Sequence, residues 1–410
     1  MPSQQEVRSL ATFIEAPVER ALLGLVYGRR RIGKSTLLVS ETRARNGFCY
    51  EATRVETPVQ LERLGSALGE HLGGGRLAFA DWGEALERLL RLPSGRDSMV
   101  VLDEFGHVLE ADRSIESVLA KALGPGSSDG RGRARLVLCG SAISMMRALT
   151  AGQAPLRGRA GLELLMQPDD FRTAATRLPD PDDLALAVAV HSVIGGVVGY
   201  ATEMTNFDLP TSAGDFDRWV TERVLSPSAP LHYEATTLLA EDPALAGAGH
   251  LLHHGILGAI ANGSVTAGAI AVKVGRKVSN LAPSLNRLVD AGFVVRHVDP
   301  LRKQRALYAL ADPYLQFHYA VLDPHRPTLR ARPSIELWRE RLADTFGARV
   351  RGPVFEEMAR TWVQRFADLA TLGGAPHHIG PSGVVIDGVD AELDVVVTGG
   401  GDVPGERTVL

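Results

Sequence analysis

Residues 22–36 read Leu22-Leu23-Gly24-Leu25-Val26-Tyr27-Gly28-Arg29-Arg30-Arg31-Ile32-Gly33-Lys34-Ser35-Thr36, an apolar run followed by the pattern G-x-x-x-x-G-K-[ST]. The apolar run predicts a buried strand, and Thr36-Leu37-Leu38-Val39 is typical of the start of a helix. A strand before the loop and a helix after it separate a phosphate-binding loop from a chance match. The alternative, a glycine-containing turn with an incidental lysine, leaves both flanks unexplained.

The loop predicts a binding site for ATP with Mg²⁺. Glycines let backbone N–H groups turn toward the β-phosphate, and the helix N-terminus adds partial positive charge. Lys34 is a candidate catalytic residue that reaches the β- and γ-phosphates, and the Ser35 hydroxyl is a candidate Mg²⁺ ligand. The three arginines either raise the local positive potential or face water. The candidate nucleotide-binding residues are Gly28, Arg29, Arg30, Arg31, Ile32, Gly33, Lys34, Ser35 and Thr36.

Composition indicates an intracellular protein of two or three domains. The chain has 410 residues, of which 45% are hydrophobic and 22% charged, as in ordinary globular proteins. The net charge of -4 excludes a global basic field, so any attraction to nucleic acid must be local. Cys49 and Cys139 lie in apolar runs, which favours a reducing cytoplasm over disulfides or a zinc site. The first residues lack the basic-then-apolar order of a signal peptide, so we expect a cytoplasmic location.

Residues 184–201 form an uncharged run long enough to suggest a membrane span. They contain His191 and the pair Gly195-Gly196, and they follow an acidic run. A buried helix followed by a glycine turn explains this segment better, so we expect no contact with a membrane.

Strand-like and helical patterns alternate through the first half of the chain. Short apolar or β-rich runs occupy residues 47–51, 98–102, 135–139 and 161–166. Between them lie stretches whose apolar residues recur at i, i+3 and i+4, the spacing of one helix face. This alternation predicts an α/β fold in which helices cover both faces of a parallel sheet. Such sheets bind ligands at the carboxyl ends of their strands.

Two adjacent carboxylates, Asp103 and Glu104, close the apolar run at residues 98–102. They supply parts that ATP hydrolysis needs, since Asp103 can bind Mg²⁺ through water while Glu104 polarises the attacking water. The alternative is that the pair only caps the following helix. The phosphate-binding loop upstream favours the catalytic role.

Two further catalytic candidates lie farther along the chain. Ser141 follows an apolar run and could sense the γ-phosphate or position the water; its alternative is a small residue in a tight turn. Arg159 could stabilise transition-state charge on phosphate, in cis or across a subunit boundary. The alternative for Arg159 is a solvated surface arginine.

Four motifs occur together and in order. They lie at residues 27–35, with the run of arginines, and at 101–105, 138–141 and 155–159. In these motifs the chain resembles the archaeal-type ATPase family, a prokaryotic group of the STAND class related to AAA+ proteins. The resemblance implies an ATPase with a P-loop fold of AAA+/STAND type, in which the sensor strand lies between the strands of the phosphate loop and of the acidic pair. It also implies the sensor position for Ser141 and strengthens Arg159 as a candidate.

One element departs from the family pattern. The helical lid of the family usually carries Gly-x-Pro, whose proline approaches the nucleotide, whereas this chain has Gly195-Gly196-Val197. Because the proline is replaced by valine, the resemblance does not imply that the bound nucleotide is coupled to the position of the lid. Binding of the nucleotide is still expected.

A winged helix-turn-helix is predicted within residues 246–330. Two helical patterns separated by Gly275 precede two apolar segments that flank a basic turn. Basic residues outnumber acidic ones in this stretch, and their contacts with phosphate would supply sequence-independent affinity for DNA. The alternative is an interdomain module that does not touch DNA. The candidate DNA contacts are Lys277, Arg287, Arg302, Lys303 and Arg305.

Residues 331–410 resemble a restriction-endonuclease-like domain, which often follows the archaeal-type ATPase. Glu356 on a helix and Asp394 at a strand end match the Mg²⁺ ligands of that domain. An acidic-x-Lys on the next strand would complete the site, but no lysine follows Asp394. We therefore expect no nuclease activity in this chain, and an exposed sheet edge that is either partly disordered or paired with a partner.

The sequence thus predicts four domains: a P-loop ATPase core (1–170), a helical lid (171–245), a winged helix-turn-helix (246–330) and a partial nuclease-like α/β domain (331–410). We predict that the protein hydrolyses ATP with Mg²⁺ as a nucleotide-driven switch. DNA, another protein and a second copy of the chain are candidate partners. The alternative is a DNA-binding regulator that uses ATP as a structural or allosteric ligand with little turnover. The histidines lack the spacing of a metal site, so we assign no metal beyond Mg²⁺.

Overall fold

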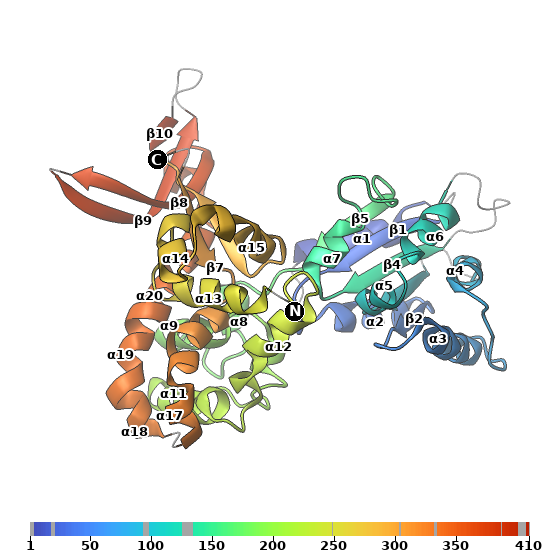
Figure 1. Ribbon diagram of the computed structural model, residues 1–410, viewed down its shortest axis with the longest axis horizontal. Coiled ribbons are helices and arrows are strands. Elements are labelled where there is room, and N and C mark those ends of the chain that lie inside the picture. Colours follow the sequence, from blue (N-terminus) through green and yellow to red (C-terminus); the bar gives the residue numbers. More distant parts are fainter. Residues whose placement is uncertain are drawn as a thin grey trace. The chain divides into compact units, whose positions relative to one another are not determined.

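The structure, a computed structural model, describes residues 4–17, 21–92, 98–124, 134–247, 249–302, 305–331, 334–386, 388–400 and 407–409. The chain divides into two units. Figure 1 shows the ribbon with colours that follow the residue number. The first unit comprises Met1–Asp169 together with the short segment Glu241–Ala244. The second comprises Asp170–Ala240 and Leu245–Leu410.

A five-stranded parallel sheet, counted over the described residues, forms the centre of the first unit. Its strand order is β2-β3-β4-β1-β5. β4 lies between β1 and β3, so the predicted position of the sensor strand is confirmed. The strands are β1 (Leu22–Tyr27), β2 (Phe48–Glu51), β3 (Met99–Asp103), β4 (Arg135–Gly140) and β5 (Ala160–Leu165).

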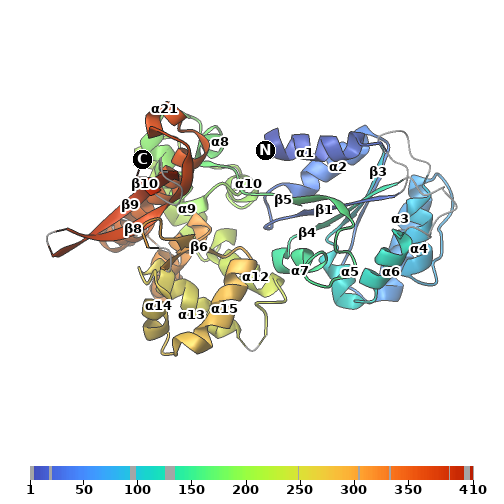
Figure 2. The ribbon, with the colours of Figure 1, turned by 90° about the horizontal axis from the view of Figure 1, so that it is seen from above.

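Helices cover both faces of this sheet, with α1 and α2 on one face and α5, α6 and α7 on the other (Figure 2). The predicted α/β P-loop fold is therefore confirmed. The helices of the first unit are α1 (Gln4–Glu15), α2 (Lys34–Ala44), α3 (Thr57–His71), α4 (Trp82–Leu90), α5 (Gly106–Ala111), α6 (Ile115–Ala122) and α7 (Ile143–Ala148).

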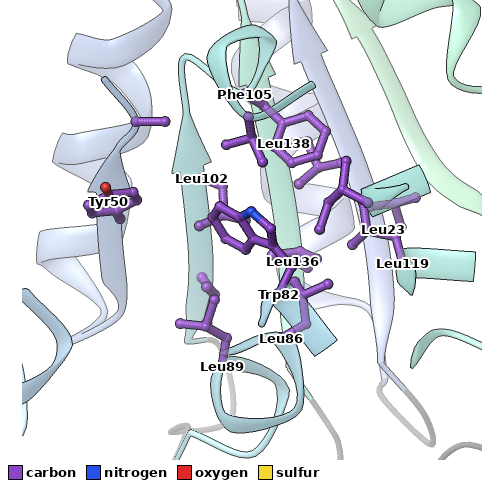
Figure 3. Close-up of a cluster of buried hydrophobic side chains, with 14 of the residues drawn as sticks. Leu23, Tyr50, Trp82, Leu86, Leu89, Leu102, Phe105, Leu119, Leu136 and Leu138 are labelled. Atoms are coloured by element: carbon purple, nitrogen blue, oxygen red, sulfur yellow. The ribbon is translucent and has the colours of Figure 1, made fainter. Parts of the chain in front are cut away.

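The main core of the first unit lies on the face covered by α5, α6 and α7. Leu102 from β3 and Leu136 and Leu138 from β4 pack there with Trp82 and Leu86 from α4 (Figure 3). Each of these side chains is 2% exposed or less. Because helices cover both faces, the strands are apolar almost throughout rather than alternating with polar residues. That burial of apolar surface is the dominant force holding the sheet together.

On the opposite face, α1 packs against the sheet across two glycines. A Cβ at Gly24 would lie 3.2 Å from the Phe13 ring, and a Cβ at Gly161 would lie 3.6 Å from it. The backbone N–H of Gln167 donates to the Glu6 carboxylate at 2.9 Å. These contacts hold α1 on β1 and β5.

Helices dominate the second unit; those with π- or 3₁₀-helical geometry carry the label η. α9 ends at Ile194 and is followed by Gly195, whose φ of 59° suits glycine, so the predicted helix and glycine turn are confirmed. No helix of the described ranges is long and apolar enough to cross a membrane. The helices before the first hairpin are α8 (Phe171–Ala175), α9 (Leu184–Ile194), α10 (Val198–Ala201), α11 (Ala213–Val220), η1 (Thr221–Leu225), η2 (Pro230–His232), α12 (Glu234–Glu241), α13 (His250–Ala261), α14 (Ala267–Lys273) and α15 (Val278–Asp290).

An antiparallel hairpin, β6 (Val294–Val298) and β7 (Ala306–Leu310), follows α15. A second antiparallel sheet, in the order β10-β9-β8, closes the described chain. Its strands are β8 (Pro376–Ile386), β9 (Val389–Gly400) and β10 (Arg407–Val409). Between the two lie α16 (Pro313–Phe317), η3 (His318–Leu322), η4 (Asp323–His325), α17 (Arg326–Ala331), α18 (Ile335–Leu337), η5 (Trp338–Leu342), α19 (Ala343–Phe346), η6 (Gly347–Arg351), α20 (Gly352–Arg365) and α21 (Leu369–Leu372).

An aromatic cluster joins helices of the second unit that lie far apart in the sequence. Phe216 from α11 contacts Trp338 from η5 and Phe346 from α19, with ring centroids 6.1 Å and 5.7 Å away. The indole N–H of Trp338 donates to the Asp217 carboxylate at 2.7 Å, which satisfies its only polar atom. The cluster ties α11 to the helices that precede α20.

Candidate nucleotide-binding site

The loop between β1 and α2 has the backbone of a phosphate cradle. β1 ends at Tyr27, and Gly33 (φ 95°) caps the start of α2 in a left-handed conformation. Gly28 (φ 153°) passes so close to the chain after β5 that a Cβ there would lie 2.4 Å from the Met166 carbonyl oxygen. Only glycine fits these two positions without displacing the loop.

Lys34 is the first residue of α2, and its side chain is buried. Its Nζ donates a hydrogen bond to the Arg29 carbonyl oxygen at 2.9 Å, which closes the loop on itself. Burial lowers the pKa of Lys34, whereas the nearby carboxylates of Glu104 and Asp103 raise it. An ammonium group at a helix N-terminus within a glycine loop fits a phosphate group.

The remaining loop residues differ in exposure. Arg29 and Ile32 are buried, at 8% and 3% exposure, so their side chains belong to the interior of the loop. Ser35 and Thr36 are exposed at the start of α2. A free hydroxyl at Ser35 is what an Mg²⁺ ligand in this position requires.

Asp103 and Glu104 lie at the end of β3. Asp103 is 3% exposed, and its Oδ1 accepts a hydrogen bond from the Glu104 backbone N–H at 2.9 Å. Glu104 has a φ of 49°, a left-handed conformation that residues other than glycine rarely adopt. The next N–H, of Phe105, donates to the Cys139 carbonyl oxygen at 2.8 Å and holds this turn against β4. Strain of this kind, held in place by the surrounding structure, is found preferentially at functional sites.

Ser141 follows β4 and contacts the acidic pair directly. Its Oγ donates to Oε2 of Glu104 at 3.2 Å. Because β1, β4 and β3 are parallel neighbours, their carboxyl ends place Lys34, Asp103, Glu104 and Ser141 at one edge of the sheet. A buried cation, two carboxylates and hydroxyl groups at this edge form a donor set that suits Mg²⁺ with phosphate.

Arg159 lies elsewhere. It precedes β5, and Ala160 pairs with Leu23 near the start of β1, so Arg159 sits at the edge of the sheet opposite the loop. Its Nη1 donates to the Ala120 carbonyl oxygen at 2.8 Å. The geometry gives no support to the predicted role of Arg159 in cis. Arg159 precedes the strand predicted at residues 161–166, and the amino end of a parallel strand lies away from the edge that binds ligands.

The structure adds one contact that the sequence did not indicate. Arg30 of the loop forms an ion pair with Glu241, more than two hundred residues away. The adjoining Asp242 is 4% exposed and accepts a hydrogen bond from Ser144 of α7 at 2.6 Å. The segment 241–244 therefore touches both the loop and the helix that follows Ser141. No local pattern could have paired Arg30 with Glu241, because only the tertiary fold brings them together.

Most predicted DNA contacts lie on the surface of the second unit. Lys277, Arg287 and Arg302 are exposed, and Arg305 is half-buried. Nη1 of Arg305 lies 3.8 Å from Oδ2 of Asp299, which is fully buried. Lys303 falls outside the described residues.

Glu356 and Asp394 lie close enough to interact electrostatically. Burial raises the pKa of Glu356, and Asp394 adds to the rise. Arg360 connects its own helix, α20, to β9. Its Nη1 donates to the Asp394 carbonyl oxygen of β9 at 2.7 Å, and its Nε donates to the Glu357 carboxylate of α20 at 2.9 Å. Over the described ranges, no group of three or more His, Cys, Asp or Glu side chains could hold a metal ion.

No model of a protein family matches the chain. An uncharacterized protein of Methanocaldococcus jannaschii is 24% identical over 308 residues, which cover 73% of this chain and 64% of that protein. The chain therefore spans less than two thirds of this relative.

Similarity to a solved structure supports the fold. The Walker-type ATPase paby2304 of Pyrococcus abyssi superposes with a TM-score of 0.55 at 19% identity, over 78% of this chain and 95% of that one. The ORC2 protein of Aeropyrum pernix, in complexes with ADPNP and ADP, gives a TM-score of 0.43 at 17% identity, over 80% and 92%. Together with the sheet order and the loop, the similarity to the Walker-type ATPase shows that the chain has an α/β P-loop fold.

Proposed function

We propose that the protein binds ATP with Mg²⁺, hydrolyses it, and acts as a nucleotide-driven switch. The observation that carries this proposal is the meeting of Lys34, Asp103, Glu104 and Ser141 beside the glycine loop. An incidental glycine turn would not need an acidic pair and a hydroxyl on the two neighbouring strands. The strained backbone of Glu104 agrees with a functional role.

Each residue has a proposed part. The loop 28–36 would hold the phosphates, with Lys34 beside the β- and γ-phosphates. Ser35 and, through water, Asp103 would hold Mg²⁺, which supplies neutralisation of phosphate charge when bound. Glu104 would accept a proton from the attacking water, and Ser141 would orient Glu104 through the hydrogen bond to Oε2. Arg159 could serve only a neighbouring copy of the chain, because it lies away from its own loop.

We also propose the domain limits 1–170, 171–245, 246–330 and 331–410. The order α13, α14, α15, β6, β7 supports a winged helix-turn-helix in the third of these. The fourth would be a nuclease-like domain without nuclease activity. Nη1 of Arg360 donates to the Asp394 carbonyl oxygen and lies 3.9 Å from Oε2 of Glu356, so a positive charge already stands beside the carboxylate that would hold a metal ion.

The proposal is tested by the affinity for ATP measured by calorimetry with Mg²⁺. Lys34→Ala should weaken the affinity by about 10–100-fold, since a charge-assisted hydrogen bond contributes about 1.5–3 kcal/mol. Lys121→Ala is the matched control, because Lys121 lies exposed on α6 of the same unit. Equal affinities of the wild type and Lys34→Ala would contradict the assignment of the loop.

A second candidate function is binding of duplex DNA, with ATP as a structural or allosteric ligand. The observation that favours it is the exposed basic surface of α14 and α15 in a chain whose net charge is -4. Affinity for a duplex oligonucleotide, measured by fluorescence anisotropy, should then fall linearly with salt concentration on logarithmic axes. Raising the salt concentration from about 50 to 200 mM strongly weakens phosphate contacts. An affinity for the duplex that does not change over this range would therefore contradict DNA as the ligand.

A further inference from the structure

The hairpin β6–β7 is anchored to the C-terminal sheet rather than free. Asp299, at the end of β6, is 0% exposed. Its Oδ1 accepts hydrogen bonds from the backbone N–H groups of Leu301 and Arg302, at 2.9 and 3.1 Å, which shape the turn of the hairpin. The same Oδ1 accepts a hydrogen bond from the Ser382 hydroxyl of β8 at 2.6 Å. One buried carboxylate thus joins the turn to the sheet.

Two further contacts support the same junction. A Cβ at Gly380 of β8 would lie 3.3 Å from the Pro300 ring, so the turn and the strand pack closely. Nε2 of His297 lies 3.4 Å from the Glu357 carboxylate of α20. Burial alone would raise the pKa of Glu357, but His297 and Arg360 outweigh it and lower the pKa to about 2. The hairpin is therefore held by both α20 and β8.

At this junction Arg305 of the hairpin lies against the C-terminal sheet. Its Nη1 would lie 3.0 Å from a Cβ at Gly383 of β8, and its charge faces the buried Asp299. Arg305 thus pairs with a buried carboxylate within the unit, while its side chain stays 37% exposed. Arg302 remains exposed at the turn.

In contrast to the docked hairpin, the preceding helices α14 and α15 expose basic side chains to solvent. Every residue from 275 to 280 is exposed, across the turn between α14 and α15. On α15, Leu281, Leu285 and Leu288 are buried, whereas Asn280 and Arg287 share an exposed face at i and i+7. The exposed cations of this surface, the α14–α15 surface, are Lys273, Arg276, Lys277 and Arg287.

We propose that duplex DNA is bound by the α14–α15 surface while the hairpin stays docked on β8 as the joint that holds the C-terminal sheet. This inference rests on the second candidate function above. An α-helix with an exposed polar face fits the major groove, and cations around its N-terminus can contact the flanking phosphates. If all four cations contact phosphates, the logarithm of the association constant should fall with the logarithm of the salt concentration with a slope of about -3.6.

The decisive experiment locks the hairpin to the sheet. The double variant Pro300→Cys and Gly380→Cys should form a disulfide under mild oxidation, because the two side chains would be in contact. Its affinity for a DNA duplex should then agree within about twofold between the oxidised and the reduced protein, since bound DNA would not require the hairpin to move. A tenfold or greater loss on oxidation would overturn the proposal, and so would failure of the cysteines to cross-link.

Single substitutions provide an independent measurement. Arg287→Ala should weaken duplex binding and reduce the salt slope by about 1, whereas Arg305→Ala should leave both unchanged. The reverse pattern would place the DNA contact on the hairpin. If the wild type itself binds no duplex, DNA is not the ligand, and the second candidate function fails together with this inference.

Discussion

Glu104→Gln is expected to lower the turnover of ATP by about 10²–10⁴-fold, the usual contribution of a general base. Glutamine preserves the size of the side chain and can still meet the Ser141 hydroxyl, which lies 3.2 Å from Oε2 in the wild type. It cannot accept a proton from the attacking water. Binding of ATP should change little, because Lys34 and the loop remain intact. Steady-state release of phosphate with Mg²⁺, beside the binding affinity for ATP, measures both quantities.

Glu110→Gln is the control for this change. Glu110 lies on α5, a few residues beyond Glu104, and its side chain, 25% exposed, forms an ion pair with the exposed Arg54. Its loss should leave turnover within about twofold, since exposed ion pairs contribute little. Unchanged turnover in Glu104→Gln would remove Glu104 from the catalytic role. Tight ATP binding without turnover in the wild type would instead favour the regulator that uses ATP as an allosteric ligand.

The second unit is expected to lose several kcal/mol of stability as the pH falls from 6.5 toward 4, because it buries neutral histidines. His318 of η3 is 1% exposed. Burial, followed by the charge of Arg326, lowers the pKa of His318 to about 3. His254 and His232 face it from α13 and η2, and burial lowers the pKa of each of them as well.

The sign of the effect follows from the two states. An unfolded histidine has a pKa of 6.5, so between pH 6.5 and 3 the unfolded chain binds more protons than the folded one. Stability contributed by His318 is therefore complete above pH 6.5 and lost progressively below it. The loss at pH 4.5 is about 3 kcal/mol for His318 alone, with about 5 kcal/mol as the upper limit.

Urea unfolding at pH 7 and pH 4.5 tests this expectation, with tryptophan fluorescence as the signal. In His318→Gln the difference in unfolding free energy between the two pH values should shrink by about 3 kcal/mol, whatever the stability at pH 7. His377→Gln, on the exposed surface of β8, is the matched control and should retain the wild-type difference. Equal pH dependence in the wild type and His318→Gln would show that His318 is not the responsible group.

The sequence by itself determined the elements of the first unit and part of its site. Alternating apolar strands and amphipathic helices specify a parallel sheet, because each element must bury its own apolar face. Residues that end parallel strands meet at one edge of that sheet. Asp103, Glu104 and Ser141 could therefore be grouped with Lys34 from local patterns, and the structure places them together.

The tertiary structure alone decided the contacts between segments remote in sequence. Folding of the whole chain paired Arg30 with Glu241. The fold also brought Ser382 to Asp299, and the hydrogen bond between them attaches the basic hairpin β6–β7 to the C-terminal sheet. Local sequence sets which elements form, since propensity and periodicity act over a few residues. Which surfaces remain free depends on packing between distant elements, and no short pattern encodes it.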